Sequence, residues 1–410
     1  MDTVLDGKIR ARAAEILLDV ERCTDPVQSA QLLPRQVYTS QDFFEFEKQA
    51  IFAREWLCVA HVNEIPNPGD QLPMTIFDEP IVVLRDLSGE IRTLSTVCQH
   101  RGHPIFDGLN ARDAEAPCLN GTKLVCPYHN WAFGLDGKLV AAPQMTETVP
   151  LKDLRRFVRL PAVRTEIFHG LVFVNFDPDA RPLAPTLAKL DAELATFGLD
   201  ELVPMPASMR RDLPWNWKIH HDNALEPYHT AFVHKGVHES APSRLAEFGE
   251  FDPGDGQIMH PTYLVSEEAS LGDAADGRRR TPGIPGLTEE QRKRVMFASV
   301  PPLIFGIFQP TFVSLSFVLP TSARTIDLRR VNLYPKSAVE VPGFEEIYAE
   351  QLKRKAVAIE QDAVTTEALQ RGYESRFAPR GPLAKLETTI PQMNAWLLTR
   401  YQAALGATDG

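Results

Sequence analysis

The chain has no apolar run long enough to span a bilayer and no block of lysine or arginine. Its 43 basic residues are outnumbered by 54 acidic residues, which gives a net charge of −11 and argues against a nucleic-acid partner. Cysteine is scarce, with five residues, and Cys23, Cys58 and Cys118 show no disulfide pattern. Such cysteine usage is typical of a reducing compartment.

The first twenty residues mix acidic and basic side chains within a helical pattern and lack the order of a signal peptide. We therefore expect a cytoplasmic protein without a membrane partner. With 410 residues, of which 44% are hydrophobic and 24% charged, the chain has the composition of an ordinary globular protein. It exceeds one usual domain, so we expect two domains or one large composite.

Two short segments each supply one cysteine and one histidine. Cys98 and His100 lie in CQHRGH, and Cys126 and His129 lie in CPYHNW. Two thiolates on one iron and two imidazoles on the other are the ligands of a Rieske [2Fe–2S] centre, and the imidazoles raise its reduction potential. A structural zinc site is the alternative, but it usually takes its cysteines as one pair and its histidines as another. The spacing therefore predicts a cluster that accepts and passes on single electrons.

The sequence shows no GxGxxG turn after a strand and no Walker-type phosphate loop. No site for NAD or flavin is therefore visible, and we expect the electrons to come from another protein. Cys118 lies between the two ligand segments without a nearby histidine, so we interpret it as a loop cysteine in a long connection.

The segment NWKIHHDNALEPYHTAFVH, residues 216–234, indicates a second metal site. Its last two histidines, His229 and His234, are five residues apart, a spacing that an unbroken α-helix does not present on one face. We therefore expect the helix to end near Thr230, or a wider turn of the kind common at metal sites. From the residues alone, three further histidines remain candidate ligands: His220, His221 and His238.

A carboxylate is the expected third ligand, because two histidines and one carboxylate on one face of Fe(II) leave positions open for oxygen. A helical pattern runs from about residue 343 to residue 371. Asp362 continues an apolar stripe of this helix, where a carboxylate is costly unless a metal or another partner compensates it. Glu360 and Glu367 lie off the stripe and are interpreted as solvated groups. The stripe consists of Tyr348, Leu352, Ala356 and Ile359.

The pattern predicts three segments. We expect residues 1–40 to form a helical segment that packs on a catalytic domain, residues 41–165 to form the Rieske [2Fe–2S] domain, and residues 166–410 to form the mononuclear iron domain. Ser40 is expected to cap an amphipathic helix that extends over residues 39–60. Short β-type runs with turn residues follow it and predict an antiparallel β domain with the cluster loops between its strands.

The order of these motifs resembles the α-subunits of Rieske non-haem iron aromatic-ring-hydroxylating oxygenases. CPYHNWAFGLDGKL is similar to the end of their Rieske domain, and NWK followed by Asp222-Asn223, Glu226, Tyr228, His229 and His234 is similar to their catalytic domain. The resemblance continues through Asp362 to Glu367 and Gln370-Arg371-Gly372 and covers most of the chain.

This resemblance implies an α+β fold, with an antiparallel β Rieske domain and a helix-grip (START/Bet v1-like) catalytic domain. The implied cofactors are a Rieske [2Fe–2S] cluster held by Cys98, His100, Cys126 and His129, and a mononuclear Fe(II). The implied partners are an NAD(P)H-dependent reductase, a ferredoxin or both. A head-to-tail homotrimer, with or without a small β-subunit, is also implied, in which each cluster serves the mononuclear iron of the neighbouring subunit.

The resemblance also assigns roles to individual residues. His229, His234 and Asp362 correspond to the ligands of the mononuclear iron, and Asn223 is expected beside that iron. Glu226 takes the place of an acidic residue that links an iron-ligating histidine to the Rieske histidine of the adjacent chain. Many members have aspartate there, whereas glutamate is also seen in relatives that act on small quaternary amines.

Three functions are compatible with these sequence features. The first is O2-dependent hydroxylation, mono- or dioxygenation, of an aromatic compound, which is favoured because it is the larger group in the resembling family. The second is hydroxylation or demethylation of a quaternary amine, which requires an aromatic cage, whereas an aromatic acid requires an arginine anchor. The third is an electron carrier without catalysis, against which a second iron site argues. Candidate apolar pocket residues are Phe297, Leu303, Phe305, Phe308 and Phe312.

Overall fold

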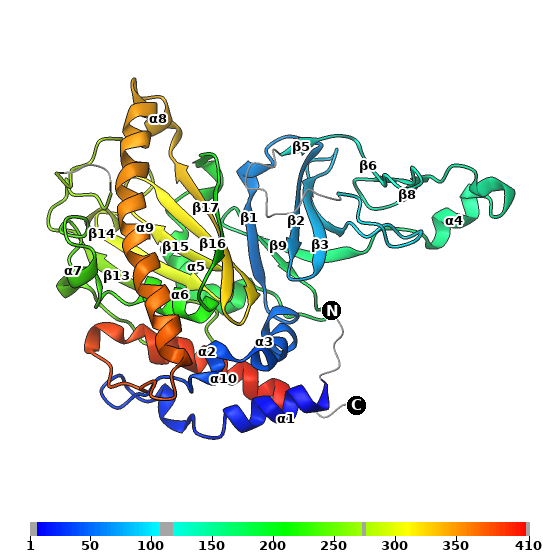
Figure 1. The fold of residues 1–410 in the computed structure, drawn as a ribbon. Helices are drawn as coiled ribbons and strands as arrows, with labels where there is room; N and C mark the ends of the chain where they lie inside the picture. The colour runs from blue at the N-terminus through cyan, green and yellow to red at the C-terminus, as the bar shows by residue number, and fades with distance from the viewer. Residues whose placement is uncertain (1–5, 107–117, 273–275, 407–410) are drawn as a thin grey trace.

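The computed structural model describes residues 6–106, 118–272 and 276–406, and it forms two lobes (Figure 1). One lobe is a β-rich unit, shown on the right of the figure, and the other is a broad sheet with the long helix α9 in front of it. Within the described ranges, no helix combines the length and the apolar character needed to cross a bilayer.

The first lobe is built on a seven-stranded antiparallel sheet in the order β1-β10-β9-β4-β3-β2-β5. A separate three-stranded sheet, β6-β7-β8, projects from it together with α4 (Figure 1). Gly137, at φ 80°, makes the turn between β7 and β8, so the LDG segment at residues 135–137 joins these two strands. The elements are β1 (Leu57–His61), β2 (Asp70–Ile76), β3 (Glu79–Arg85), β4 (Ile91–Ser95), β5 (Leu119–Asn120), β6 (Lys123–Val125), β7 (Ala132–Gly134), β8 (Leu139–Ala141), α4 (Leu151–Phe157), β9 (Ala162–Phe168) and β10 (Leu171–Asn175).

The second lobe is a curved antiparallel sheet in the order β11-β17-β16-β15-β14-β13, with β12 also paired to β17. Helix α9 (Phe344–Glu374) passes across this sheet, and α6 and α7 lie beside it (Figure 1). The other elements are α5 (Ala188–Leu194), β11 (Val203–Pro204), β12 (Ser208–Leu213), α6 (Trp217–Leu225), α7 (Thr230–Val233), β13 (Ile258–Tyr263), β14 (Arg294–Val300), β15 (Ile304–Phe308), β16 (Val313–Ser322), β17 (Thr325–Tyr334), α8 (Lys336–Val339) and α10 (Thr389–Gly406). This arrangement of helices on an antiparallel sheet confirms the predicted α+β class.

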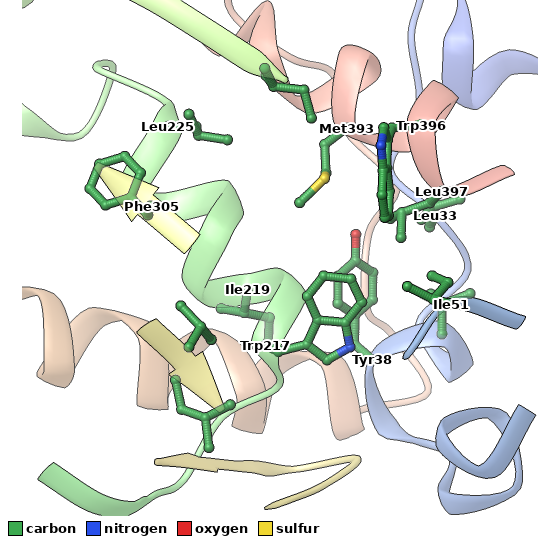
Figure 2. Close-up of a cluster of buried hydrophobic side chains, with 14 of the residues drawn as sticks. Leu33, Tyr38, Ile51, Trp217, Ile219, Leu225, Phe305, Met393, Trp396 and Leu397 are labelled. Carbon is green, nitrogen blue, oxygen red and sulfur yellow. The ribbon is translucent and has the colours of Figure 1, made fainter. Parts of the chain in front are cut away.

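The N-terminal helices pack on the second lobe through one large apolar cluster. These helices are α1 (Gly7–Ile16), α2 (Gln36–Thr39) and α3 (Gln41–Glu47). Tyr38 and Ile51 meet Trp217 of α6 and Trp396 of α10 in this cluster (Figure 2). Because Trp217 begins the helix that leads to the predicted metal site, the cluster fixes the position of that helix.

A buried ion pair ties the same elements together. Lys218 Nζ lies 2.8 Å from Glu47 Oε1, and both side chains are completely buried. Tyr401 and Trp217 also donate hydrogen bonds to the Glu47 carboxylate. Loss of one partner from such a pair leaves an uncompensated charge and costs about 3–5 kcal/mol.

The helix predicted over residues 39–60 is only partly present. Ser40 does cap a helix, since its Oγ accepts a hydrogen bond from the Phe43 N–H at 3.3 Å. However, α3 ends at Glu47, a π-helical turn follows over Lys48–Phe52, and Leu57–His61 form strand β1. The prediction is wrong beyond Phe52 because every residue of β1 is buried and the strand pairs with β10.

The predicted terminal helix corresponds to α9, but the environment of its apolar stripe differs from the expectation. Leu352 is 42% exposed, and Leu352 and Ile359 line an open cavity instead of a closed core. The buried positions of α9 include Gln351, Ala363 and Thr366. The stripe therefore faces the cavity, which lies between the helix and the sheet.

Candidate metal centres

The first candidate centre lies at two loops of the β-rich lobe. Cys98 and His100 follow strand β4, and Cys126 and His129 lie between β6 and β7. Each loop is closed by a backbone hydrogen bond between residues four positions apart. Gly102 N–H donates to Cys98 O, and Asn130 N–H donates to Cys126 O. The chain turns sharply at Gly102 and Asn130, whose φ angles are 78° and 54°. Glycine and asparagine adopt this left-handed conformation more readily than other residues.

These two loops bury their thiols and leave their imidazoles near the surface. Cys98 and Cys126 are each 2% exposed, whereas His129 is exposed. The imidazole rings lie 4.8 Å apart, centre to centre, and His100 stacks on Trp131 at 4.6 Å. The structure therefore brings all four predicted ligands together, with the histidines on the outer side.

The electrostatics of these loops suit a metal cluster. Burial, followed by the neighbouring Cys126 thiol, raises the pKa of Cys98, so two thiolates at this place require nearby positive charge. Desolvation, together with His129 and Arg101, lowers the pKa of His100 and favours the neutral imidazole that a metal needs. All five cysteines are free thiols.

The second candidate centre starts at an interruption between two helices. Helix α6 ends at Leu225, residues 226–229 form a turn, and α7 begins at Thr230. Glu226 adopts an extended conformation, φ −96° and ψ 125°, because the residue before a proline is pushed out of the helical region. The helix thus ends five residues before the predicted Thr230, and a turn intervenes, as expected under the second alternative. This turn lets two histidines five residues apart point the same way.

His229, His234 and Asp362 converge at this turn, and their ligand atoms all lie within 4.8 Å of one another. The two Nε2 atoms are 3.3 Å apart, and Asp362 Oδ1 lies 3.5 Å from His229 Nε2 and 3.0 Å from His234 Nε2. Asp362 Oδ1 is buried and accepts no hydrogen bond of good geometry within the described ranges. Three ligand-type atoms therefore face one small volume.

The outer ring nitrogens determine what those atoms can bind. His229 Nδ1 lies 2.7 Å from Glu226 Oε1, and His234 Nδ1 lies 2.9 Å from Gln361 Oε1. Both partners are hydrogen-bond acceptors, so each Nδ1 carries the proton and each neutral ring presents the lone pair of Nε2 to its neighbour. Two lone pairs and a carboxylate repel one another unless a cation lies between them, so the residues fit a divalent metal such as Fe(II).

The pKa shifts reflect the same concentration of negative charge. Burial lowers the pKa of His229, but its contacts with Asp362 and Glu226 raise it to about 9. Burial raises the pKa of Asp362, but the two histidines hold it well below its usual range. A bound cation would take the place of the proton that these values favour.

The other candidate histidines do not join this group. His221 is buried, with hydrogen bonds to Pro302 O at 2.9 Å and Ser299 Oγ at 3.0 Å. His220 stacks on Trp215, and His238 stacks on His234. Burial lowers the pKa of both His220 and His238 to about 3, so they remain neutral.

A cavity of about 620 Å³ adjoins the second centre, between α9 and the sheet. Asn223 is buried and lines it, as do Glu226 and all three converging residues. Three of the five predicted apolar residues also line it: Phe297, Phe305 and Phe312. Leu303 and Phe308 instead belong to closed cores, so their assignment to the pocket is wrong. Phe308 is three residues beyond Phe305 on β15 and therefore points to the other face of the sheet.

Sequence reasoning missed Gln361. This residue precedes Asp362 on α9, and its Oε1 lies 2.9 Å from Nδ1 of His234, the second predicted histidine ligand. Its only sequence signal is the position beside Asp362, and a glutamine on a helix surface is too common to single out. The long connection between the cluster segments, for which no role was predicted, falls at residues 107–117, outside the described residues.

One lobe holds two cysteines and two histidines in neighbouring loops, and the other holds two histidines and one carboxylate beside a cavity. These two sets of residues define a protein with two distinct metal environments. Comparison with known families agrees: residues 55–160 match the Rieske [2Fe-2S] domain, and residues 199–403 match the ring hydroxylating alpha subunit (catalytic domain). The chain belongs to the Rieske ring-hydroxylating oxygenase α-subunit family. The predicted family and the predicted cofactors, a Rieske [2Fe–2S] cluster and a non-haem Fe(II), are confirmed.

Individual relatives differ in substrate. The chain is 36% identical over 228 residues to the carnitine monooxygenase oxygenase subunit of Escherichia coli (strain K12), covering 55% of this chain and 58% of that protein. It is 27% identical over 277 residues to the benzene 1,2-dioxygenase subunit alpha of Pseudomonas putida, covering 66% of this chain and 57% of that protein. The chain thus spans little more than half the length of these curated relatives.

A solved structure supports the fold. The crystal structure of the quaternary ammonium Rieske monooxygenase CntA, with an inhibitor, superposes with a TM-score of 0.77 at 22% identity. The superposition covers 94% of this chain and 99% of that chain. The two-lobe architecture is therefore the fold of that structure.

Proposed function

We propose that this protein is a terminal oxygenase that takes electrons through its Rieske cluster and oxidises a small organic molecule carrying a quaternary ammonium group. The observation that carries this proposal is the convergence of two imidazole lone pairs and one carboxylate beside a large cavity, in a chain that also has the Rieske loops. A stand-alone electron carrier would have no use for a second metal site or for a cavity of this size.

His229, His234 and Asp362 would hold Fe(II), and Cys98, His100, Cys126 and His129 would hold the cluster. When bound, the iron supplies O2 activation and the cluster supplies single electrons. Because His229, His234 and Asp362 line the cavity, a metal that they held would be accessible from it. The protein itself would orient the substrate and keep the ligands in the required protonation state.

Glu226 would act on proton and electron coupling. Its Oε1 accepts the Nδ1–H of His229 at 2.7 Å, and its Oε2 accepts the His229 backbone N–H at 3.1 Å. These two bonds hold the ring in one orientation and one tautomer, and the negative charge makes the ring a stronger donor to the metal. Across a subunit interface, the same carboxylate would link His229 to His129 of a neighbouring copy. Asn223 would contact substrate or oxygen beside the iron.

A quaternary amine is preferred as substrate over an aromatic ring. The supporting observation is the higher identity to a carnitine monooxygenase subunit, 36%, than to a benzene dioxygenase subunit, 27%. The cavity also offers aromatic rings that can attract a trimethylammonium group, namely those of Trp215, Phe297 and Phe305. Ring oxidation of an aromatic compound remains the second candidate, because the same rings would pack against such a substrate.

The remaining assignments follow from this function. A reductase or ferredoxin would deliver the electrons, and a homotrimer would place each cluster near the iron of the next subunit. A cytoplasmic location would supply both partners. We also propose the division of the chain into an N-terminal segment at 1–40, a Rieske domain at 41–165 and a catalytic domain at 166–410, although strands β9 and β10 extend the sheet of the Rieske lobe past the second boundary.

Oxygen uptake tests the proposal directly. Iron-replete protein and a surrogate reductase should consume O2 in a fixed ratio to product with trimethylammonium compounds such as L-carnitine and γ-butyrobetaine. Benzene and naphthalene serve as aromatic comparisons, and uptake with them should be slow and uncoupled from product. Tight coupling to the aromatic compounds alone would replace the proposed substrate class with the second candidate.

A further inference from the structure

The cavity beside the second metal centre is lined by more basic than acidic side chains. Its basic lining residues are Arg210, Arg330, Arg354 and Lys355. Its acidic lining residues are Glu226, Glu360 and Asp362. A divalent metal at the second centre would add further positive charge. Such a cavity is electrostatically unsuited to a substrate that carries positive charge alone.

The acidic residues are already engaged by other groups. Glu226 is hydrogen-bonded to His229, and Asp362 faces the two histidine nitrogens. Glu360 pairs with Arg210 at 3.3 Å. None of these carboxylates forms an ion pair with Arg330 within the described ranges.

Arg330 is a cation of this cavity that has no carboxylate partner within the described ranges. It lies on β17, lines the cavity, and forms no ion pair within the described ranges. Its Nε donates to Ser316 Oγ at 3.3 Å, which leaves the terminal nitrogens for another partner. Burial lowers its pKa to about 10, so it still carries its charge at neutral pH. An enclosed guanidinium without a counter-ion is costly, and an anionic ligand would remove that cost.

The surroundings of Arg330 leave room for such a ligand. Ser316 and Asn332 also line the cavity, on the neighbouring strand and two residues further along β17. Lys355 Nζ is bound to Asn332 Oδ1 at 2.8 Å and lies 3.9 Å from the centre of the Phe312 ring. A fixed ammonium group, short polar side chains and a free guanidinium fork together form a polar end of an otherwise apolar cavity.

This polar end is electrostatically linked to the metal centre. The negative charge of Asp362 raises the pKa of Arg330, against the larger effect of burial. Arg330 and the three converging residues line the same cavity of about 620 Å³, so a small molecule held by its carboxylate at Arg330 can extend its other end toward them. A guanidinium binds a carboxylate through two parallel hydrogen bonds, which fixes orientation as well as position.

We propose that Arg330 binds a carboxylate group of the substrate, so that the cavity selects carboxylates, including zwitterionic betaines, over compounds that carry positive charge alone. The inference rests on the proposed function only in taking this cavity as the substrate site. It assigns a specificity-determining residue and narrows the substrate class to molecules with an anionic group at one end.

Binding measurements on matched pairs of compounds test the proposal. The probes are L-carnitine with its methyl ester, and benzoate with methyl benzoate, each titrated calorimetrically into iron-replete protein. The parent protein should bind at least one acid more tightly than its ester. Arg330→Gln should weaken binding of that acid by at least tenfold, about 1.4 kcal/mol, and leave ester binding unchanged. Arg330→Lys, which keeps the charge without the fork, should fall between the two.

Arg210→Gln is the matched control, because Arg210 lines the same cavity but already has Glu360 as its counter-ion. Its effect on the acids should be clearly smaller. Iron content and the thermal unfolding midpoint, measured for every variant, separate a local effect from loss of metal or fold. Equal losses for acid and ester, equal losses in Arg210→Gln and Arg330→Gln, or no preference of the parent for any acid would each overturn the proposal.

The same panel separates this inference from the proposed function. If benzoate alone binds and its binding depends on Arg330, the anchor stands and the quaternary amine is wrong. If L-carnitine is oxidised with tight coupling and Arg330→Gln binds it as the parent does, the function stands and the anchor is wrong.

Discussion

Each of the two candidate metal centres contains a pair of histidines, but the two pairs differ in their exposure to solvent. At the Rieske loops the thiols are buried and His129 is exposed on the surface of the β-rich lobe. At the second centre the ligands line an internal cavity, and His234 is only 4% exposed. Electrons can pass between surface groups without any substrate contact, whereas oxidation of a substrate requires a cavity that holds it against the metal. The difference in burial therefore separates a relay from a reaction site.

The two centres also differ in what supports their histidines. His100 and His129 are packed by the aromatic rings of Trp131 and Tyr128. His229 and His234 are instead held by hydrogen bonds to Glu226 and Gln361. Acceptors on the outer ring nitrogens set the tautomer and strengthen the metal bond, which a centre with only three protein ligands needs.

Removal of a predicted iron ligand should have the largest effect, because it should empty the second centre and leave the Rieske centre intact. We expect Asp362→Asn to lose the mononuclear iron and to reduce turnover by more than ~100-fold, because a missing ligand costs more than a missing hydrogen-bond partner. The Rieske centre should remain, so iron should fall from about three to about two per chain. Iron analysis and the visible spectrum provide the measurement. A simultaneous loss of the cluster signal would show that the two centres are not independent.

Glu226→Gln should separate metal binding from turnover. Glutamine keeps an acceptor oxygen for His229 but loses the negative charge, so both irons should stay while turnover falls by about 10- to 100-fold. Single-turnover rates of reduced protein should fall along with steady-state rates. Full activity with normal iron content would refute the role assigned to Glu226.

Gln361→Leu should give a smaller effect at the same centre. The lost acceptor is neutral, and neutral hydrogen bonds are roughly half as strong as charged ones, so we expect iron affinity to fall by about tenfold. Gln361→Glu is the matched control, since it restores an acceptor and should bind iron at least as tightly as the parent. Titration of the metal-free second centre with Fe(II) distinguishes the variants. Identical affinities in all three proteins would remove Gln361 from the metal site.

Two carboxylates should show the smallest effects, and only one of them should make stability depend on pH between pH 5 and pH 7. Burial raises the pKa of Asp222 to about 7, with Glu226 and Glu387 adding to the rise. In the Rieske lobe, burial raises the pKa of Asp86, but hydrogen bonds from Ser88 and Arg92 outweigh it and bring the pKa down to about 2.

The signs follow from proton binding. Between the unfolded pKa of Asp222 and pH 7 the folded protein holds a proton that the unfolded chain has lost, so stability falls as pH rises, by at most ~1.4 kcal/mol per pH unit. Asp222→Asn should remove this slope between pH 5 and pH 7. Asp86→Asn should lower stability equally at both pH values, since Asp86 is ionised in both states there. Urea unfolding at the two pH values provides the measurement, and an unchanged slope in Asp222→Asn would contradict the raised pKa.

The sequence revealed the two centres to different degrees. The Rieske ligands could be assigned because all four lie in two short loops, where spacing alone limits the geometry. Helical periodicity and a ligand preference pointed to Asp362, whereas only the family resemblance singled out His229 and His234 from three other candidate histidines. The break after Leu225 was placed too late because the effect of Pro227 on Glu226 was overlooked. Arg330 could not be found, since a strand pattern does not tell which face borders a cavity.

Larger errors came from tertiary context. The helical pattern of residues 39–60 continues into β1, which becomes a strand because it is buried against β10. Leu352 and Ile359 have a core-like pattern but line an open space, because α9 spans the sheet without closing on it. Both outcomes depend on segments far away in the chain, which local periodicity does not describe.

Mössbauer spectroscopy of iron-replete protein tests the central claim most directly, because it counts the two iron environments in one sample. We predict two parts of iron in a Rieske [2Fe–2S] cluster and one part in a high-spin ferrous site, with the ferrous part absent from Asp362→Asn. A sample that contains only the cluster signal, or whose ferrous signal persists in Asp362→Asn, would contradict the account.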